Sequence, residues 1–380
     1  MKYYIIAGEA SGDLHGSNLI KELKLQDAAA TIRYWGGDMM ENAGGTLVKH
    51  YRELAFMGFD EVLMNLRTIL RNLKFCKEDI LQFKPDALIL IDYPGFNLRM
   101  AKWAKQKGFK VIYYISPQVW AWKENRVKMM KQCIDKMLVI LPFEKKYYKD
   151  KWDWEVEYVG HPLVKVIDEF RADSQESGVN DSELPTQNSR LIALLPGSRK
   201  QEIAKKLPVM LEVCKFFPDY QFIIAKAPSV DDEFYNQFSK GYKNVSAIKN
   251  KTYDLLAKAS AALVTSGTAT LETALFGVPQ AVCYKGSFLT YHIGKRLVQV
   301  KYIAMVNLIM KKPVVKEFIQ HELTAANLQK ELHDLLNNDS RITAISKDYE
   351  ILRLLLSEEG KSASSKAAAS IYKFLNAGAT

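Results

Sequence analysis

The segment 3–24, "YYIIAGEASGDLHGSNLIKELK", decides the fold class of this chain. Residues 3–7 are apolar, as expected of a strand buried on both faces of a parallel sheet, and residues 16–24 follow a helical pattern. Between them lie polar side chains that a structural turn does not need: Glu9, Ser11, Asp13 and His15. Because ligands of open α/β sheets bind at the carboxyl ends of the strands, this loop is the first candidate site.

The same alternation of apolar runs and amphipathic helical patterns continues along the chain. The expected strands fall within 2–8, 31–37, 87–92, 110–116, 136–142 and 155–161 of the first half, and within 191–198, 220–228, 261–267 and 280–286 of the second. Helical patterns separate them, for example at 97–108, which closes with a glycine. The alternation predicts an α/β protein with two Rossmann-like, doubly wound domains that face a shared cleft.

A chain of 380 residues exceeds the size at which one hydrophobic core stops growing, so two domains are expected. Residues 172–189 are polar and lack aromatic side chains, which favours a linker. We therefore predict an N-terminal domain over 1–171, that linker, and a C-terminal domain over 190–340. Helices within 341–380 are expected to pack back on the N-terminal domain or on a partner subunit.

The composition is that of an ordinary globular protein with a basic excess. Lys and Arg number 53 against 43 Asp and Glu, so the net charge is +10. Three interpretations of this excess are open. The positive charge keeps the protein soluble, binds an anionic membrane surface, or binds a polyphosphate substrate. Nucleic-acid binding is not expected, because the basic residues are spread over many helices and no nucleic-acid module pattern occurs.

Cysteine usage and hydrophobic patterning indicate a cytoplasmic protein. The four cysteines are scattered in apolar neighbourhoods without zinc-like spacing, so we expect reduced core residues and no metal site. We expect no signal peptide, because no basic region precedes the first strand, and no apolar run approaches the ~18 residues of a membrane span.

Two loops of the second half have the features of an anion site at a strand end. In "LLPGSRKQEI", 194–203, a glycine permits close approach of a ligand, Ser198 is able to hydrogen-bond, and Arg199 offers a cationic fork for phosphate oxygens. The alternative is an ordinary helix N-terminus with a surface arginine.

In "LVTSGTATLETALFGVPQAV", 263–282, the turn consists of Ser266, Gly267 and Thr268, and the amides of the following helix are a ready anion site. Glu272 lies one turn further and is placed to accept hydrogen bonds from a ribose diol. The alternative, which does not exclude the first, is a capping box with Thr268 or Ala269 at the cap.

Two loops of the first half also carry polar side chains at strand ends. Asp92 ends an apolar strand, where a carboxylate is costly unless it points into a cleft. The alternative is an Asx turn into a proline, with Asn97 as a helix cap. At 114–122, Gln118 and two tryptophans form another such loop, which suggests an apolar or sugar-like surface or packing between the domains.

Taken together, the loops resemble those of the bacterial lipid-A-disaccharide synthases, which are glycosyltransferases of the GT-B type with two Rossmann-like domains. The motifs that carry the resemblance are "AGEASGD" (7–13), "DYPGFN" (92–97), "YISPQVWAW" (114–122), "LPFE" (141–144), "VGHP" (159–162), "LLPGSR" (194–199), "TSGTATLE" (265–272) and "MVNLI" (305–309). They cover nearly the whole chain, and all eight in this order are specific.

The resemblance implies inverting transfer of 2,3-diacylglucosamine from UDP-2,3-diacylglucosamine to 2,3-diacylglucosamine 1-phosphate. The products are lipid A disaccharide 1-phosphate and UDP. The resemblance implies no cofactor, and the chain has no Asp-x-Asp metal motif. The charge on UDP is then expected to be met by Arg199, beside Ser198, and by the helix amides at 266–268, with Glu272 at the ribose hydroxyls.

Inversion needs a general base for the acceptor hydroxyl. The resemblance makes Asp92 the first choice, and His15 is the alternative because imidazole suits base chemistry near neutral pH. The resemblance also links Asn307 to activity, as a group that orients sugar or phosphate. Further candidates for substrate contact are Gly8, Glu9, Ser11, Gly12, Asp13, Asn97 and Gln118. Asp13 has an open alternative, which is to cap the helix that follows.

Two other functions stay open beside this one. Another GT-B enzyme acting on UDP-N-acetylglucosamine shares the fold, and a non-catalytic nucleotide-sugar-binding protein would share the donor site. The joint presence of Asp92, Arg199 and Glu272 favours the transferase.

Because both implied substrates carry acyl chains, we expect peripheral attachment to the inner face of the cytoplasmic membrane. Residues 54–77 combine an apolar helical face with a stripe of Arg67, Arg71 and Lys74, which suits an anionic surface. The alternative is that this face covers the first sheet. The apolar segment 349–356 predicts either a homodimer contact or docking on the chain's own first domain.

Overall fold

The computed structural model describes residues 1–54, 66–177, 190–286, 301–357 and 360–377. Its contacts divide the chain into a first unit, Met1–Pro162 with Leu356–Thr380, and a second unit, Leu163–Leu355. The helix α9 (Leu163–Ser177) runs from the predicted N-terminal domain into the predicted linker and belongs to the second unit. Residues 178–189 of that linker lie outside the described residues.

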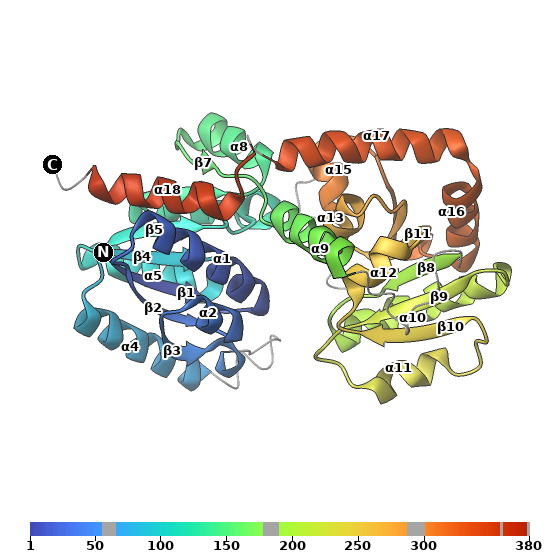
Figure 1. The fold of residues 1–380 in the computed structure, drawn as a ribbon, viewed down its shortest axis with the longest axis horizontal. Coiled ribbons are helices and arrows are strands. Elements are labelled where there is room, and N and C mark those ends of the chain that lie inside the picture. The colour runs from blue at the N-terminus through green and yellow to red at the C-terminus, as the bar shows by residue number, and fades with distance from the viewer. Residues whose placement is uncertain (55–65, 178–189, 287–300, 358–359, 378–380) are drawn as a thin grey trace. The chain divides into compact units, whose positions relative to one another are not determined.

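The first unit is built on a seven-stranded sheet in the order β3-β2-β1-β4-β5-β6-β7, in which every pair is parallel (Figure 1). The strands are β1 (Lys2–Ala7), β2 (Thr31–Gly36), β3 (Thr46–His50), β4 (Ala87–Ile91), β5 (Lys110–Tyr114), β6 (Lys136–Val139) and β7 (Glu157–Tyr158). All five residues of β4 are buried, as the apolar run predicts.

Helices cover both faces of this sheet. They are α1 (Ala10–Gln26), α2 (Asp38–Ala43), α4 (Leu66–Phe83), α5 (Pro94–Gln106), α6 (Val119–Trp122), α7 (Val127–Cys133), α8 (Pro142–Trp152) and α18 (Ala363–Asn376). One core cluster joins the sheet to α1 and α18, and the other joins it to α4, α5, α7 and α8. In Figure 1 the red helix α18 lies with the blue elements of the first unit and packs against α1. The chain thus completes its first unit with its last helix.

The second unit has a six-stranded parallel sheet in the order β10-β9-β8-β11-β12-β13. Its strands are β8 (Leu191–Leu195), β9 (Gln221–Lys226), β10 (Val245–Lys249), β11 (Ala261–Thr265), β12 (Gln280–Tyr284) and β13 (Lys316–Ile319). Its other helices are α10 (Lys200–Val213), α11 (Asp232–Ser239), α12 (Thr252–Lys258), α13 (Thr268–Leu275), α15 (Met305–Met310), α16 (Ala325–Asn337) and α17 (Asp339–Leu356). The predicted α/β class with two doubly wound domains is confirmed.

Each sheet has one point where the strand order reverses. In the first unit it lies between β1 and β4, and in the second between β8 and β11. The loops after these four strands begin at residues 8, 92, 196 and 266. Since ligands of open α/β sheets bind at such points, the fold brings the predicted loops to the expected edge of each sheet.

The described part of the segment 54–77 covers the sheet. In α4, Leu73 and Cys76 are buried in the core, whereas Arg67, Arg71 and Lys74 are exposed. A buried Asp79 carboxylate further along α4 accepts from the hydroxyl of Tyr4 at 2.7 Å and pairs with Arg33. This part of the apolar face of α4 packs on the sheet, as the alternative predicted, whereas Leu70 is 56% and Phe75 is 44% exposed. Residues 55–65 lie outside the described residues.

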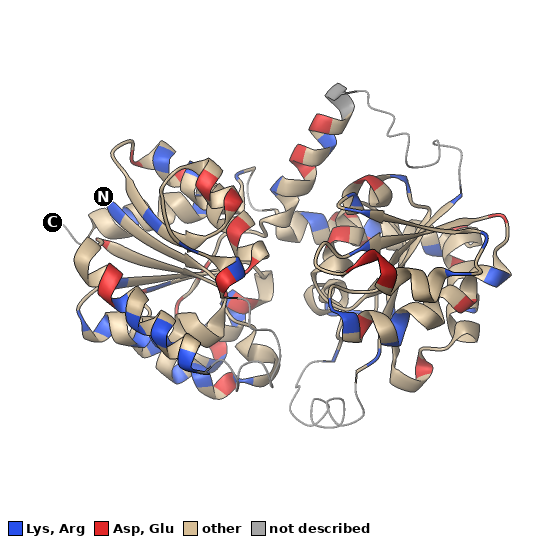
Figure 2. Cartoon of the chain, turned by 90° about the horizontal axis from the view of Figure 1, so that it is seen from below, with Lys and Arg blue, Asp and Glu red and all other residues tan. Residues whose placement is uncertain are grey.

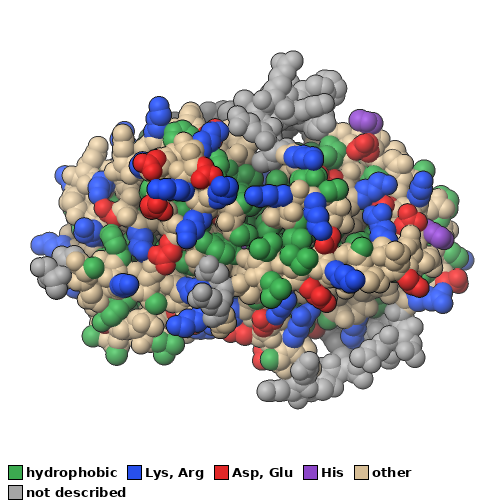
Figure 3. Space-filling model, turned by 90° about the horizontal axis from the view of Figure 1, so that it is seen from above, with side chains coloured by type: hydrophobic (Ala, Val, Ile, Leu, Met, Phe, Trp, Pro, Cys, Tyr) green, Lys and Arg blue, Asp and Glu red, His purple; other side chains and the backbone are tan. Residues whose placement is uncertain are grey.

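Lys and Arg occur on helices of both units, as the sequence predicts (Figure 2). Among the described residues, no helix combines the length and apolar character needed to cross a bilayer. Exposed apolar side chains do occur on α17, where Leu354 is 73% and Ile351 is 47% exposed. Figure 3 looks onto α17 and shows hydrophobic side chains among charged ones.

Candidate active site

Asp92 follows β4 at the reversal point of the first sheet, in an unusual backbone conformation. Its φ is +42° and that of Tyr93 is +47°, in the left-handed region that non-glycine residues rarely adopt. The carbonyl of Asp92 accepts hydrogen bonds from the Asn97 amide and the Tyr113 hydroxyl. These contacts hold a strained turn in place, and strain of this kind concentrates at functional sites.

Asn97 lies inside α5 and does not cap it. The helix begins at Pro94 with Tyr93 at the N-cap, so Asn97 is in the first helical turn and is completely buried. Its Nδ2 donates to the carbonyl oxygens of Ile6 at 3.3 Å, Ile91 at 3.1 Å and Asp92 at 2.8 Å. The side chain therefore ties the ends of β1 and β4 together, which corrects the predicted cap.

The Asp92 carboxyl is a base suited to neutral pH. Burial, and then the nearby Glu9 carboxylate, raise its pKa to about 6, against the opposing hydrogen bond from the Tyr93 amide. Glu9 itself is exposed at the N-cap position of α1. At pH 7 most Asp92 carboxyls are ionised and able to accept a proton.

His15 lies on α1 and is partly buried. Desolvation lowers its pKa to about 4, so the imidazole is neutral at pH 7 and is a weaker base than the Asp92 carboxylate. Its Nδ1 is buried without a hydrogen-bond partner among the described residues. The electrostatics thus favour Asp92 over His15 as the base.

The two glycines of the first loop are required by packing within the protein. A Cβ on Gly8 would lie 2.2 Å from Cδ1 of the Tyr93 ring, and one on Gly12 would lie 3.1 Å from the Cβ of Ala7. A side chain at position 8 would collide with the Tyr93 ring, and one at position 12 would press tightly on Ala7 where α1 starts close to β1. The substrate contact that the sequence suggests for both residues stays a prediction.

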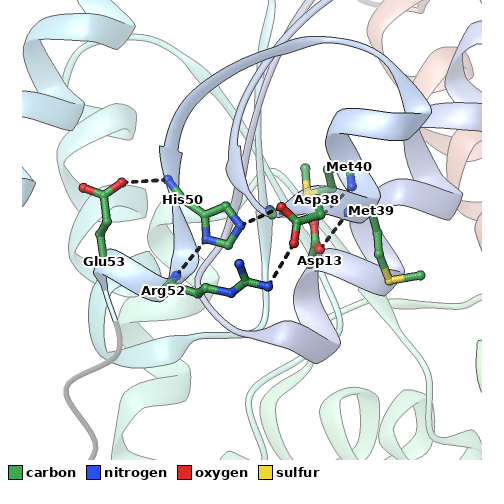
Figure 4. A network of polar contacts seen from close by, with 8 residues as sticks. Asp13, Asp38, Met39, Met40, His50, Arg52 and Glu53 are labelled. Carbon is green, nitrogen blue, oxygen red and sulfur yellow. Dashed lines mark hydrogen bonds and ion pairs between the residues drawn. The ribbon is translucent and has the colours of Figure 1, made fainter. Parts of the chain in front are cut away.

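Asp13 has a different partner from either predicted one. The side chain is buried on α1, and its carboxylate accepts from the backbone amides of Gly37 at 2.7 Å and of Met39 and Met40 at 3.1 Å each (Figure 4). Asp13 therefore caps the N-terminus of α2 and not that of α1, the helix in which it lies. Ser11, in contrast, is exposed in the first turn of α1.

The loop after β5 is held by a second buried carboxyl. Glu144 of α8 accepts from the indole Nε1 of Trp120 and from the Leu141 amide, each at 3.1 Å. Burial raises the pKa of Glu144 to about 8. The motif "LPFE" contains this residue, but no local pattern assigns it a role.

The tryptophans of this loop have different environments. Trp120 is buried and so cannot belong to an exposed apolar or sugar-like surface, whereas Trp122 is 53% exposed with Lys123 Nζ 3.8 Å from its ring centroid. Gln118 is exposed at the N-cap of α6. Ile115, just before, has φ +69°, a strained value for a β-branched residue.

In the second unit, the loop after β8 presents its polar side chains to solvent. Gly197 has φ +121°, and Ser198 and Arg199 are both exposed. Arg199 is the N-cap residue of α10, and its Nη1 lies 3.6 Å from a carboxylate oxygen of Glu202. The guanidinium is therefore available to a ligand at the carboxyl edge of the sheet.

The loop after β11 lies beside it in the sheet order. Gly267 is the N-cap of α13 with φ +137°, so the alternative cap at Thr268 or Ala269 is wrong. Thr268 is exposed, and the Ser266 hydroxyl donates to the carbonyl of Ile303 at 2.8 Å. A glycine cap supplies no side-chain acceptor, so the first amides of α13 stay available to an anion.

Glu272 and Asn307 are both anchored by neighbours. The Tyr253 hydroxyl donates to Oε1 of Glu272 at 3.0 Å, and burial raises the pKa of this carboxyl. Asn307 is buried, with its amide bonded to the backbone of Val315 and to Glu317. Its side chain is thus engaged within the protein, and the predicted contact with sugar or phosphate stays a prediction.

Comparison with known proteins identifies the family. The chain matches the family described as lipid-A-disaccharide synthetase over residues 3–372. It belongs to this family. Lipid-A-disaccharide synthase 1 of Legionella pneumophila is 38% identical over 359 residues, which cover 93% of this chain and 92% of the relative. Lipid-A-disaccharide synthase of Geobacter metallireducens is 40% identical over 339 residues, 88% of this chain and 87% of the relative.

As a lipid-A-disaccharide synthetase family member, the chain is a glycosyltransferase of lipid A biosynthesis. Solved structures agree in fold at low identity. UDP-GlcNAc 2-epimerase from Neisseria meningitidis, bound to UDP-GlcNAc, gives a TM-score of 0.70 at 12% identity, covering 99% of this chain and all of that one. The kitacinnamycin glycosyltransferase gives 0.65 at 13% identity over 98% of each chain. Both support the GT-B architecture.

Metal-binding groups do not gather in the described parts of this family member. Among those residues, no three His, Cys, Asp or Glu side chains are placed to hold a metal ion. The four cysteines are free and buried, as predicted.

Proposed function

We propose that the chain transfers 2,3-diacylglucosamine from UDP-2,3-diacylglucosamine to 2,3-diacylglucosamine 1-phosphate, which gives lipid A disaccharide 1-phosphate and UDP. Family membership over nearly the whole chain supports the reaction class. The observation that carries the mechanism is the Asp92 carboxyl, with its pKa raised to about 6, at the reversal point of the first sheet.

In this mechanism Asp92 accepts the proton of the acceptor's 6-hydroxyl as the oxygen attacks the anomeric carbon of the donor sugar. The new C–O bond forms on the face opposite UDP while the bond to the diphosphate breaks, so the configuration inverts. The proton then passes from Asp92 to solvent. A positioned base of this kind contributes a factor of ~10²–10⁴ to the rate.

The second unit would hold the donor. Arg199 and the Ser198 hydroxyl are exposed at the end of β8, and the amides at 266–268 begin α13 at the end of β11. Charge-assisted hydrogen bonds from these groups suit a diphosphate and stabilise its growing charge as UDP departs. Tyr253 holds one oxygen of Glu272, and we assign the carboxylate to the ribose hydroxyls.

The first unit would hold the acceptor. Glu9, Ser11 and Gln118 are exposed polar groups at the carboxyl edge of its sheet, and we assign them to acceptor hydroxyls and phosphate. Asp13 and Asn97 are occupied by backbone groups, so we assign them to holding the loops in place.

For acyl-chain substrates we further propose peripheral attachment to the anionic inner face of the cytoplasmic membrane. The exposed stripe of Arg67, Arg71 and Lys74 supports an electrostatic contact, each basic residue contributing about 1 kcal/mol near such a surface. Leu73 and Cys76 are buried, so of the described apolar side chains of α4 the exposed Leu70 and Phe75 would be the ones to meet the headgroup layer.

A homodimer through α17 is proposed as well. Leu354, Ile351 and Leu355 are exposed on this helix, and such side chains favour contact with a second copy. Light scattering at micromolar concentration should show a dimer for the wild type and a monomer for Leu354→Glu. A monomeric wild type would exclude this contact.

The test of the reaction is turnover of purified protein with both lipid substrates, followed by mass analysis of the product. Disaccharide and UDP in equal amounts are expected. An enzyme that acts on UDP-N-acetylglucosamine would release UDP with that donor instead, and a non-catalytic binding protein would release none.

A further inference from the structure

Lys206 is a buried lysine at the donor edge of the second sheet that the mechanism so far does not use. It lies on α10, and its side chain is only 4% exposed. Its ammonium group donates to the hydroxyl of Thr265, the last residue of β11. A Cβ on Gly197, in the loop after β8, would lie 3.5 Å from Lys206 Nζ. The charge is thus held between the two strand ends where the sheet order reverses.

The protein compensates this buried charge only in part. Glu202 is the carboxylate near it, and its Oε2 lies 3.8 Å from Nζ, too far for a hydrogen bond. In the described part of the chain, Thr265 is its one hydrogen-bond partner, although an ammonium has three donors. Burial correspondingly lowers the pKa of Lys206, and Glu202 partly restores it.

A purely structural role gives no reason for a charge at this position. Buried charges are costly unless they are paired, and a hydrophobic residue of similar volume often serves packing as well or better. An anion that binds above the loop would supply the missing compensation. The Ser198 hydroxyl and the Arg199 guanidinium, the proposed diphosphate ligands, belong to this same loop.

We propose that Lys206 supplies a fixed positive charge beneath the diphosphate site and so favours nucleoside diphosphates over uncharged nucleosides. This inference rests on the proposed donor site of the second unit. Lys206 is a positioning residue, because it acts through the Thr265 hydroxyl and the Gly197 loop, and its field reaches the phosphates through protein, where salt screens it little.

The test compares Lys206→Met, which keeps the length of the side chain and removes the charge, with the wild type. Affinities for UDP and for uridine are measured by titration calorimetry. Lys206→Met should lose at least about tenfold in UDP affinity while uridine affinity stays unchanged. The control is Lys215→Met, an equal loss of charge at an exposed position after α10, which should bind UDP like the wild type.

The dependence on pH provides a second readout. As the pH rises, the wild type should lose UDP affinity when the ammonium deprotonates, and Lys206→Met should show a smaller loss. The charged or titratable groups near Lys206 are Glu202 and Lys205 on α10 and Cys283 on β12, and burial raises the pKa of Cys283 to about 12.

Three results would overturn the inference. They are unchanged UDP affinity in Lys206→Met, an equal loss of uridine affinity, and an equal loss in Lys215→Met. Thermal unfolding shows whether each variant folds. If Lys206→Met does not fold, Lys206→Gln replaces it. A wild type that does not bind UDP contradicts the proposed function itself, and the two failures are therefore distinguishable.

Discussion

The side-chain amide of Asn97 donates to the backbone carbonyl of Asp92 at 2.8 Å, and also to those of Ile91 at the end of β4 and Ile6 near the end of β1. One buried amide thus fixes the turn that carries the proposed base to the two strands at the reversal point. The proposed base is therefore held mainly through its backbone, and among the described residues the one hydrogen bond to its carboxylate comes from the Tyr93 amide.

Asp92→Asn should keep the shape of the turn and reduce transfer by a factor of ~10²–10⁴, because the amide cannot accept the acceptor's proton. In the wild type, kcat/KM should rise with pH and level off above about 6, since the base must be ionised. His15→Gln is the control and should keep at least half of the activity. If Asp92→Asn keeps that much instead, Asp92 is not the base.

Asn97→Ala should lower the free energy of unfolding by about 1–3 kcal/mol, because the buried contacts to the carbonyls of Ile6 and Ile91 are lost. It should also lower kcat with little change in KM, since the turn under Asp92 loses its anchor. Urea unfolding and steady-state kinetics measure both effects. Asn236→Ala, at an exposed position of α11, should change neither. A normal kcat in a destabilised Asn97→Ala would show that the amide does not position the base.

Glu144 should make the stability of the protein depend on pH in an unusual direction. Its pKa is about 8 in the folded protein against an ordinary value of 4.5, so the folded state holds the proton more tightly than the unfolded state. The free energy of unfolding should fall as pH rises from about 5 to 8. In Glu144→Gln this fall should be smaller. Parallel pH profiles for the two proteins would mean that Glu144 is ionised when buried.

Arg199→Ala should weaken UDP binding about tenfold, the lower end for a charge-assisted hydrogen bond, because the side chain is 67% exposed and solvent screens it. Calorimetry with UDP and with uridine separates a phosphate contact from a general loss. Lys200→Ala removes the neighbouring charge, which pairs with Asp231, and should have little effect. Unchanged UDP affinity in Arg199→Ala would remove it from the diphosphate site.

Charge reversal on α4 should release the protein from anionic vesicles. Arg67→Glu/Arg71→Glu is compared with wild type by sedimentation at low and moderate salt, and binding should fall in both conditions. Lys145→Glu/Lys146→Glu makes the same change in charge at exposed positions of α8. If the two double variants lose binding equally, the contact depends on net charge and not on α4.

The central strands were predictable because burial on both faces leaves an unbroken apolar run. Each predicted strand region contains an observed strand, whereas β3, β10 and β13 were missed. All three lie at a sheet edge, and two consecutive residues of β10 are exposed. Such strands need fewer apolar side chains, so their sequences resemble loops.

The site was predictable in position but not in the partners of its side chains. Strand ends placed Asp92 and Arg199 at the correct edges of their sheets. Asp13, however, meets the amide of Gly37 on another element, and Asn307 meets Val315 across a turn. These hydrogen bonds join residues of different elements that only the packed fold brings together, so no local sequence pattern predicts them. Lys206 resembles any surface lysine of an amphipathic helix until its burial is seen.

The return of α18 to the first unit has a consequence for synthesis of the protein. Ala367, Ala368 and Ile371 are fully buried in a core cluster that they share with α1 and the first sheet. During translation that cluster stays incomplete until the last helix leaves the ribosome, after the whole second unit has been made. The N-terminal half therefore waits with an apolar surface uncovered, and fragments ending near residue 162 should need a chaperone or aggregate.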